Sequence, residues 1–345
     1  MTSILEQEIR EQPEVLRRLI ETSADQAQAI MDAVRGKFNY ILIAARGSSD
    51  NAARYAQYLF QIVNEVPVAL ATPSVFSLYH KAPKLEGALV LGISQSGQSP
   101  DIVSVLEEAR RQSRPSVAVT NDPNSPLAQA AQFNLNLQTG QEKAVAATKT
   151  YTASLVAMAL LSNALEKDKA AFTEIQRLPV QVQETVEQTM LQTSRMERYR
   201  YMQHGAVIGR GYNYSTAFEV ALKIKELTGI TTVPYSSADF LHGPVASLTA
   251  GYPVFAIAPQ GVMAGDMAAI IAKAKAAVAE LVVISDLQEL LSQAQLPLPI
   301  PQGVPEWLSP IVSVIPGQIL AWQMALSRGL DPDKPKGLSK VTETL

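Results

Sequence analysis

The fold is decided by one stretch of sequence, Ala88–Ser99, which reads ALVLGISQSGQS. An apolar run ends in a hydroxyl-rich loop, and Pro100 then opens a predicted helix that continues to Arg111. A short apolar run followed by a polar loop and a helix is typical of a buried strand in a parallel sheet with helices on both faces. This stretch therefore predicts an α/β fold.

The same pattern recurs along the chain. Further apolar runs in the first half predict strands at 40–45, 116–120 and 133–137 and helices at 51–64 and 148–165. A second series begins near residue 195, with strands at 206–209, 252–258 and 281–285 and helices at 214–227 and 316–328. The first strand of each series ends in Arg-Gly, at Arg46-Gly47 and at Arg210-Gly211. This shared register predicts an internal duplication: two tandem domains, each a doubly wound, flavodoxin-like parallel sheet flanked by helices.

The length of 345 residues suits two domains of about 100–200 residues each. We expect an N-terminal helical segment over 1–35, with a helix at 4–33 that restarts at Pro13. The domains are predicted at 36–166 and 196–330, joined by a helical connection. A tail at 331–345 has no pattern of regular structure.

Composition excludes several classes of function. The net charge is −3 without a basic stripe, so we expect no nucleic-acid partner. No cysteine is present, and two of the three histidines, His80 and His204, have no ligand spacing, so we expect no metal. The N-terminus lacks a signal-peptide pattern, and the most apolar stretch that we identify, Ser154–Leu161, has only the length of a core helix. We therefore expect a cytoplasmic protein with no membrane partner.

Two strand ends in the first half carry clustered hydroxyl groups. Both lie at helix N-termini, where backbone N–H groups and the helix dipole favour an anion, and glycine allows the backbone to approach closely. The alternative is that the serines only cap these helices. The candidate phosphate-binding residues are Gly47, Ser48, Ser49, Ser94, Gln95, Ser96, Gly97 and Ser99.

The second half carries ionisable groups in place of hydroxyls. Its loops at 211–213 and 258–261 are nearly free of hydroxyl side chains, which predicts one phosphate site per chain. Glu219, Lys223 and Glu226 fall on one stripe of the predicted helix, and spacing alone favours a solvated face with a weak ion pair. His242, in a loop before Gly-Pro, is a candidate acid–base group.

Six short motifs in one order carry a resemblance to a known family. They are Glu8–Pro13, Ser94–Gly97, Ala147–Lys149, Glu219–Glu226, His242–Pro244 and Leu338–Thr342. Across almost its whole length the chain resembles the tandem sugar-isomerase (SIS) domain family, which includes the isomerase half of glucosamine-6-phosphate synthase and stand-alone glucosamine-6-phosphate deaminases.

The resemblance implies roles for individual residues. Glu226 matches the carboxylate that moves a proton between C1 and C2, with Lys223 as an auxiliary lysine beside it. His242 matches the residue that opens the sugar ring from the neighbouring subunit, which implies a homodimer. Lys340 matches a tail lysine that engages the open sugar, and Val145 a sugar-contacting backbone position. The serine-rich loops match the phosphate site for a hexose 6-phosphate or amino-hexose 6-phosphate.

Two departures from the synthase bear on the reaction. The synthase has a glutaminase domain with a cysteine nucleophile, which this sequence does not contain, and Ala147 replaces a serine near the sugar. Residues 235–240 and the tail look more like the deaminases. We therefore expect conversion of glucosamine 6-phosphate to fructose 6-phosphate and ammonia, with no metal or organic cofactor. The alternatives are a fructosamine-6-phosphate deglycase, another aldose–ketose isomerase of sugar phosphates, and a non-catalytic sugar-phosphate sensor.

Overall fold

The computed structural model describes residues 2–340, which form two compact units. The first unit comprises residues 14–142 and 149–177, with Ser339 and Lys340 of the tail. The second comprises residues 2–13, 143–148 and 178–338. Helix α1 (Ile4–Val34) contributes to both units, as does α7 (Lys169–Met190), which occupies the predicted helical connection.

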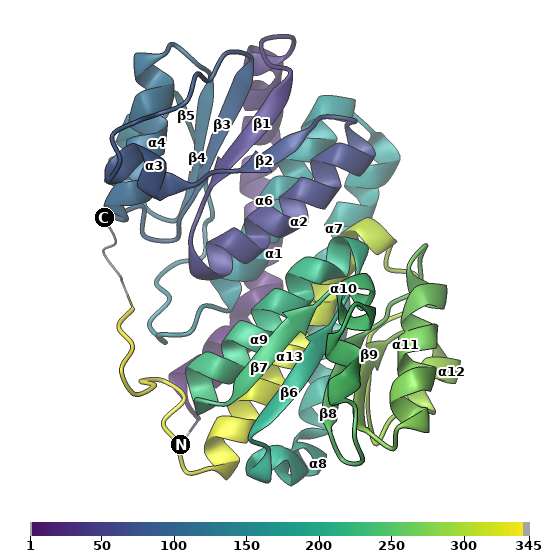
Figure 1. Cartoon of the computed structure of the whole chain (residues 1–345). Coiled ribbons are helices and arrows are strands. Elements are labelled where there is room, and N and C mark those ends of the chain that lie inside the picture. Colours follow the sequence, from purple (N-terminus) through teal and green to yellow (C-terminus); the bar gives the residue numbers. More distant parts are fainter. Residues whose placement is uncertain (1, 341–345) are drawn as a thin grey trace. The chain divides into compact units, whose positions relative to one another are not determined.

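The first unit is built on a five-stranded parallel sheet in the order β2-β1-β3-β4-β5. Its strands are β1 (Tyr40–Ala44), β2 (Val68–Leu70), β3 (Ala88–Ile93), β4 (Ser116–Thr120) and β5 (Phe133–Asn136). Helices α3 (Pro73–Ser77), α4 (Pro100–Arg111) and α5 (Pro126–Ala130) pack on one face, and α2 (Gly47–Val63) and α6 (Lys149–Glu166) lie on the other (Figure 1). The strand order and the two helical layers confirm the doubly wound sheet predicted from the apolar runs.

The second unit repeats this topology. Its strands, β6 (His204–Ile208), β7 (Thr231–Tyr235), β8 (Pro253–Ile257), β9 (Glu280–Ser285) and β10 (Leu296–Pro299), form a parallel sheet in the order β7-β6-β8-β9-β10. Helices α10 (Ser237–Leu241), α11 (Ala264–Ala276) and α12 (Gln288–Leu291) cover one face, and α9 (Tyr214–Thr228) and α13 (Ser309–Ser327) the other (Figure 1). Helix α8 (Thr193–Met196) precedes β6, and short 3-10 turns occupy Glu197–Tyr201, Gly211–Asn213, Pro244–Ser247 and Glu306–Leu308. The identical strand order supports the predicted duplication.

Three helix boundaries differ from the sequence prediction. Helix α2 begins at Gly47, four residues before the predicted start, because Gly47 turns the chain directly from β1 into the helix with φ +54°. Helix α1 continues through Pro13, and α13 begins at Ser309 with Pro316 inside it. A proline inside a helix removes one backbone hydrogen bond, and in the deeply buried α13 packing outweighs that loss.

Helix α13 also corrects the expectation about the most apolar stretch. Residues Glu306–Ser327 are long and apolar enough to cross a membrane by length and composition, whereas Ser154–Leu161 is much shorter. Nearly all of this segment is buried inside the protein, as in the core helix of a soluble domain.

The start of α1 is fastened to the tail within the second unit. The backbone N–H groups of Ile4 and Leu5 donate to the two carboxylate oxygens of Asp333, at 3.0 and 2.8 Å. Trp322 of α13 donates through Nε1 to Ser3 Oγ at 2.9 Å. A carboxylate at a helix N-terminus satisfies N–H groups that have no partner within the helix and complements the helix dipole.

Helix α13 approaches α9 closely at a glycine. A Cβ atom built on Gly317 would lie 2.3 Å from Cγ2 of the buried Val220 on α9. Real Cβ atoms do not approach another atom so closely, so only glycine allows the two helices to pack at this distance. The packing therefore fixes the position of α9, which carries Glu219, Lys223 and Glu226.

We expect Gly317→Ala to destabilise the protein by ~1–3 kcal/mol, because the added methyl group must push α13 and α9 apart. Gly265→Ala is the matched control: it is also a helical glycine, but a Cβ there meets nothing within 4 Å. That change should be neutral or stabilising by up to about 1 kcal/mol. Urea unfolding of the two variants measures the difference, and equal stability would show that the close approach costs nothing to relax.

Candidate active site

The hydroxyl-rich segments of the first unit lie at neighbouring strand ends. Strands β1 and β3 pair in parallel, with Ala44 opposite Gly92, so α2 and α4 begin beside each other. Ser99 is the N-cap residue of α4, but within the described chain its side chain makes no capping hydrogen bond. By contrast, Ser125 caps α5 by accepting from the Ala128 N–H. The capping alternative is therefore wrong for Ser99, and the N-terminus of α4 keeps the character of an anion site.

The loop between β3 and α4 is held in a tight internal structure. Ser94 Oγ accepts from the Gly97 N–H at 3.1 Å, and Ser96 Oγ accepts from the Gln98 N–H at 3.3 Å. A hydroxyl group that accepts such a bond still has its own O–H to donate to an anion. Gly97 has φ +64°, and a Cβ there would lie 2.2 Å from Ser125 Oγ, so the position requires glycine.

The equivalent loop of the second unit is built with carboxylates. Asp286 Oδ1 accepts from the Gln260 N–H at 2.7 Å, and Glu306 accepts from the N–H groups of Val262 and Met263 at 2.9 and 3.4 Å. Fixed negative charges thus take the N–H groups of this loop and would repel a phosphate. This arrangement supports the prediction of a single phosphate site per chain, in the first unit.

Ser94→Ala and Ser96→Ala should each weaken binding of a hexose 6-phosphate by ~1.5–3 kcal/mol, the usual contribution of a hydrogen bond to a charged group. Gln260→Ala, in the corresponding loop of the second unit, should leave the binding constant unchanged. Calorimetric titration with fructose 6-phosphate measures all three. Equal weakening by Gln260→Ala would contradict the assignment of the site to the first unit.

The acidic and basic residues of α9 form a largely buried group. The side chains of Glu219 and Lys223 are 0% and 1% exposed, and that of Glu226 is 24% exposed. Lys223 Nζ lies 3.4 Å from Glu219 Oε1 and 2.5 Å from Glu226 Oε2. The solvated-face interpretation is therefore wrong for Glu219 and Lys223. Burying a charge is costly unless it is paired, and Lys223 is paired with both glutamates. Because Glu226 alone in this group is partly exposed, it is the member that a ligand can reach.

His242 is the residue that directly follows the short helix α10, at its C-terminal end. Ser236 caps α10 by accepting from the Asp239 N–H, and the His242 N–H donates to Asp239 O at the other end. The His242 side chain is exposed. The loop is thus fixed at its base while the imidazole is accessible.

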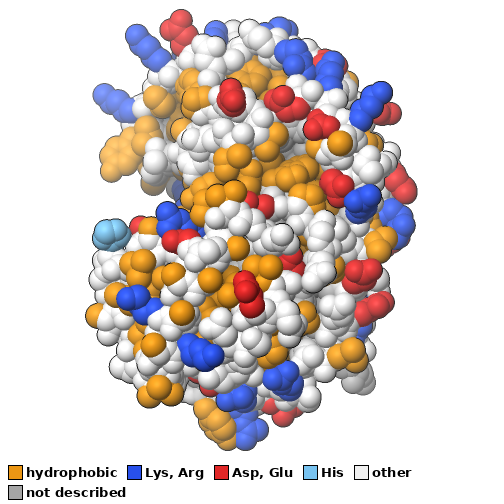
Figure 2. Space-filling model, turned by 90° about the vertical axis from the view of Figure 1, so that its right-hand side faces the viewer, with side chains coloured by type: hydrophobic (Ala, Val, Ile, Leu, Met, Phe, Trp, Pro, Cys, Tyr) orange, Lys and Arg blue, Asp and Glu red, His pale blue; other side chains and the backbone are white. Residues whose placement is uncertain are grey.

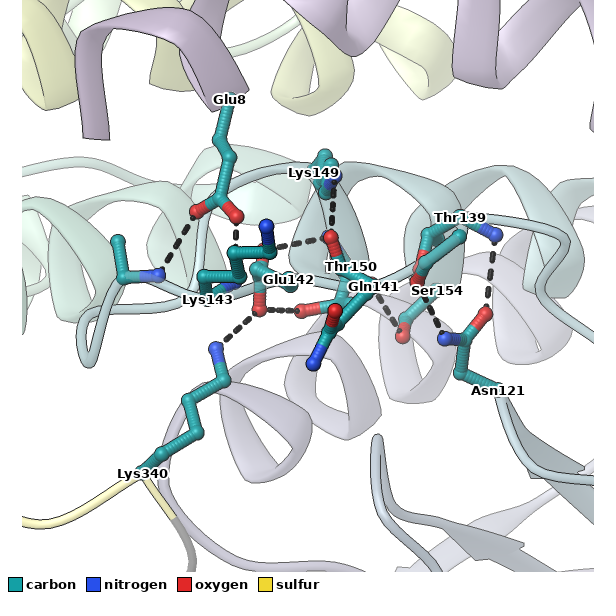
Figure 3. Close-up of polar contacts among 12 residues, drawn as sticks. Glu8, Asn121, Thr139, Gln141, Glu142, Lys143, Lys149, Thr150, Ser154 and Lys340 are labelled. Carbon is teal, nitrogen blue, oxygen red and sulfur yellow. Dashed lines mark hydrogen bonds and ion pairs between the residues drawn. The ribbon is translucent and has the colours of Figure 1, made fainter. Parts of the chain in front are cut away.

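The tail lysine contacts a buried carboxylate that our sequence reasoning missed. Lys340 Nζ lies 2.6 Å from Oε2 of Glu142 (Figure 3). Oε2 also accepts from the Thr150 hydroxyl group at 2.7 Å, and Oε1 accepts from the Thr150 backbone N–H at 3.1 Å. The Glu142 side chain is fully buried. Lys340 is described, whereas Val341 and Thr342 of the same motif lie outside the described residues.

A second glutamate, Glu8 of the Glu8–Pro13 motif in α1, holds a segment that is distant in sequence. The Glu8 carboxylate accepts from the N–H groups of Lys143 and Ala144 at 2.5 and 3.2 Å (Figure 3). These bonds hold the segment that leads to Val145, whose own N–H donates to Asp333 O at 3.3 Å. The predicted sugar-contacting position is therefore held by its own N–H and by the two residues before it.

Glu142→Gln should lower turnover and raise the rate at which Lys340 reacts with an amine-acylating reagent, because a neutral amide holds an ammonium group less strongly than a carboxylate does. Mass spectrometry of the labelled tail peptide measures the second effect. Glu108→Gln is the control, since it breaks an ion pair with the exposed Arg111 in the same unit. Unchanged labelling of Lys340 in Glu142→Gln would show that the ion pair does not position the lysine.

Comparison with known proteins identifies the family. The SIS domain model matches residues 37–164 and again 203–328. This chain belongs to the SIS domain family. It is 33% identical over 343 residues to glutamine–fructose-6-phosphate aminotransferase (isomerizing) of Thermococcus kodakarensis, covering 96% of this chain and 56% of that protein. The chain thus spans little more than half the length of this relative.

Solved structures of SIS proteins agree with the fold. The C-terminal domain of glucosamine-fructose-6-phosphate aminotransferase from Francisella tularensis superposes with a TM-score of 0.85 at 25% identity, covering 97% of this chain and 99% of that one. Glucosamine-6-phosphate deaminase from Thermotoga maritima superposes with a TM-score of 0.81 at 21% identity, covering 99% and 100%. The second likeness is one of fold alone.

Proposed function

We propose that this chain is a phosphosugar isomerase that converts glucosamine 6-phosphate to fructose 6-phosphate and ammonia. Membership of the SIS family and similarity to the isomerase domain of an aminotransferase support the coarser assignment, a SIS-type phosphosugar isomerase. The observation that carries the proposal is the group on α9: a partly exposed Glu226 held by the buried Lys223.

The reaction needs a base, a ring-opening group and a handle for the phosphate. His242 would transfer a proton to open the pyranose. Glu226 would then take the proton from C2 and return it to C1, which converts the open amino-aldose to a ketose imine. Water adds to the C2 imine and ammonia leaves, giving fructose 6-phosphate. The hydroxyl-rich loops of the first unit hold the phosphate away from C1 and C2, so binding energy from a non-reacting group orients the reacting atoms.

The absence of cysteine from the sequence bears on the source of nitrogen. A glutaminase of the synthase kind uses a cysteine nucleophile, so this chain by itself should not draw ammonia from glutamine. High ammonium should drive the reverse reaction slowly. The test is ammonia release from a panel of amino-hexose 6-phosphates, with glutamine plus fructose 6-phosphate as the comparison; glutamine-dependent synthesis above the ammonium rate would contradict the proposal.

Glu226→Gln should reduce turnover of glucosamine 6-phosphate by ~10²–10⁴ with little change in KM, because the amide keeps the shape of the side chain but cannot accept the proton. Release of ammonia and formation of fructose 6-phosphate are both measured. Near-normal turnover in this variant would show that Glu226 does not transfer the proton. If the wild type binds hexose 6-phosphates without turnover, the result would favour a non-catalytic sensor.

We also propose that two chains share each active site, with His242 acting in its neighbour's pocket. His242→Ala and Glu226→Gln should each be nearly inactive. After subunit exchange in equal amounts, about half the dimers are mixed, and each mixed dimer has one intact site if the residues act from different chains. About a quarter of the wild-type activity should then return. No recovery after demonstrated exchange would place His242 in its own chain's site.

A further inference from the structure

A buried carboxylate lies in the helix turn that we assign to phosphate. Asp101 is in the first turn of α4, two residues after Ser99, and its side chain is fully buried. Its Oδ2 accepts from Arg46 Nε at 2.8 Å, and its Oδ1 accepts from the Ile102 N–H at 2.9 Å. Arg46 is the N-cap residue of α2, directly before the Gly47-Ser48-Ser49 turn, and its side chain is 49% exposed.

The position of Asp101 creates an electrostatic problem for the phosphate site. A fixed carboxylate beside the N-terminus of α4 repels a phosphate dianion at the same N-terminus, and burial reduces the screening of that repulsion by water. The guanidinium group of Arg46 compensates the charge. It also joins the start of α2 to the start of α4, the two segments that carry the candidate phosphate-binding serines.

The second unit contains an equivalent arginine–aspartate pair, but no phosphate site is predicted beside it. Arg210, the residue before Gly211, lies 3.1 Å from Oδ2 of Asp266 in the first turn of α11. Both side chains there are about a third exposed, and Ser237 also bonds to each of them. The pair therefore belongs to the duplicated framework. Only in the first unit is its carboxylate fully buried beside hydroxyl-rich loops.

We propose that Arg46 is a positioning residue for phosphate binding: it neutralises Asp101 and ties the two serine-bearing helix starts together. The inference rests on the proposed function, in that it requires the first unit to bind the phosphate of a sugar phosphate. On this proposal, the affinity for phosphate depends on the neutralisation of Asp101 by Arg46 as well as on the hydroxyl groups of the serines. Asp101 without Arg46 would oppose binding.

The experiment separates charge compensation from direct contact with the ligand. Binding of fructose 6-phosphate and of inorganic phosphate is measured by calorimetry on the wild type, Arg46→Gln, Asp101→Asn and the double variant. Arg46→Gln keeps a donor toward Asp101 but loses the charge, and it should weaken binding by ~10–100-fold. Asp101→Asn should bind at least as tightly as the wild type, because it removes the repelling charge, and adding it to Arg46→Gln should restore most of the lost affinity.

Two controls complete the design. Arg46→Lys retains the charge and should bind within about fivefold of the wild type. Arg210→Gln breaks the equivalent pair in the second unit and should not change the affinity for inorganic phosphate. Thermal unfolding of every variant separates loss of binding from loss of fold. If Arg46→Gln does not fold, the affinity of Arg46→Lys is compared with that of Arg46→Lys/Asp101→Asn. Tighter binding by the double variant supports charge compensation, and equal binding contradicts it.

The outcomes distinguish the inference from the function on which it rests. A double variant as weak as Arg46→Gln would show that Arg46 acts by touching the phosphate itself, which overturns the charge-compensation role. Unchanged affinity in a folded Arg46→Gln also overturns it. A wild type that binds no hexose 6-phosphate would instead refute the proposed function.

Discussion

Burying an ammonium group in a protein is costly unless the charge is paired, and on α9 Glu219 and Glu226 pair with Lys223. This compensation constrains much of the second unit. It requires α9 to present one charged stripe away from its apolar face, and that apolar face must pack closely enough on α13 to need a glycine at 317. As a result, the partly exposed carboxylate of Glu226 is held in place by the buried Lys223.

The duplicated framework shows how two copies of one domain take different roles. Both units place a polar loop and a helix N-terminus after their equivalent strands, and both join an arginine to an aspartate there. In the first unit the loop N–H groups are bonded by serine hydroxyls, which remain neutral. In the second unit carboxylates bond to them. Charged side chains of both signs are scattered over the face of the molecule in Figure 2.

The central strands of both sheets were predictable because parallel strands buried on both faces are continuous apolar runs. The edge strands β7 and β10 were not, since they contain prolines, Pro234 in the one and Pro297 and Pro299 in the other, which sheets tolerate at their edges. Burial of Glu219 and Lys223 depends on tertiary packing, which spacing within one helix does not reveal, so spacing alone gave the wrong environment. Glu142 carried no signal, because one of its partners, Lys340, is 198 residues away.

The discontinuity of the second unit has a consequence for synthesis on the ribosome. The first unit is encoded almost entirely by residues 14–177, so it can collapse while the remainder of the chain is still being translated. The second unit needs residues 2–13 together with residues up to 338, and Asp333 can bond to the start of α1 only after residue 333 has been synthesised. The first turn of α1 therefore lacks its carboxylate partner until Asp333 has been added to the nascent chain.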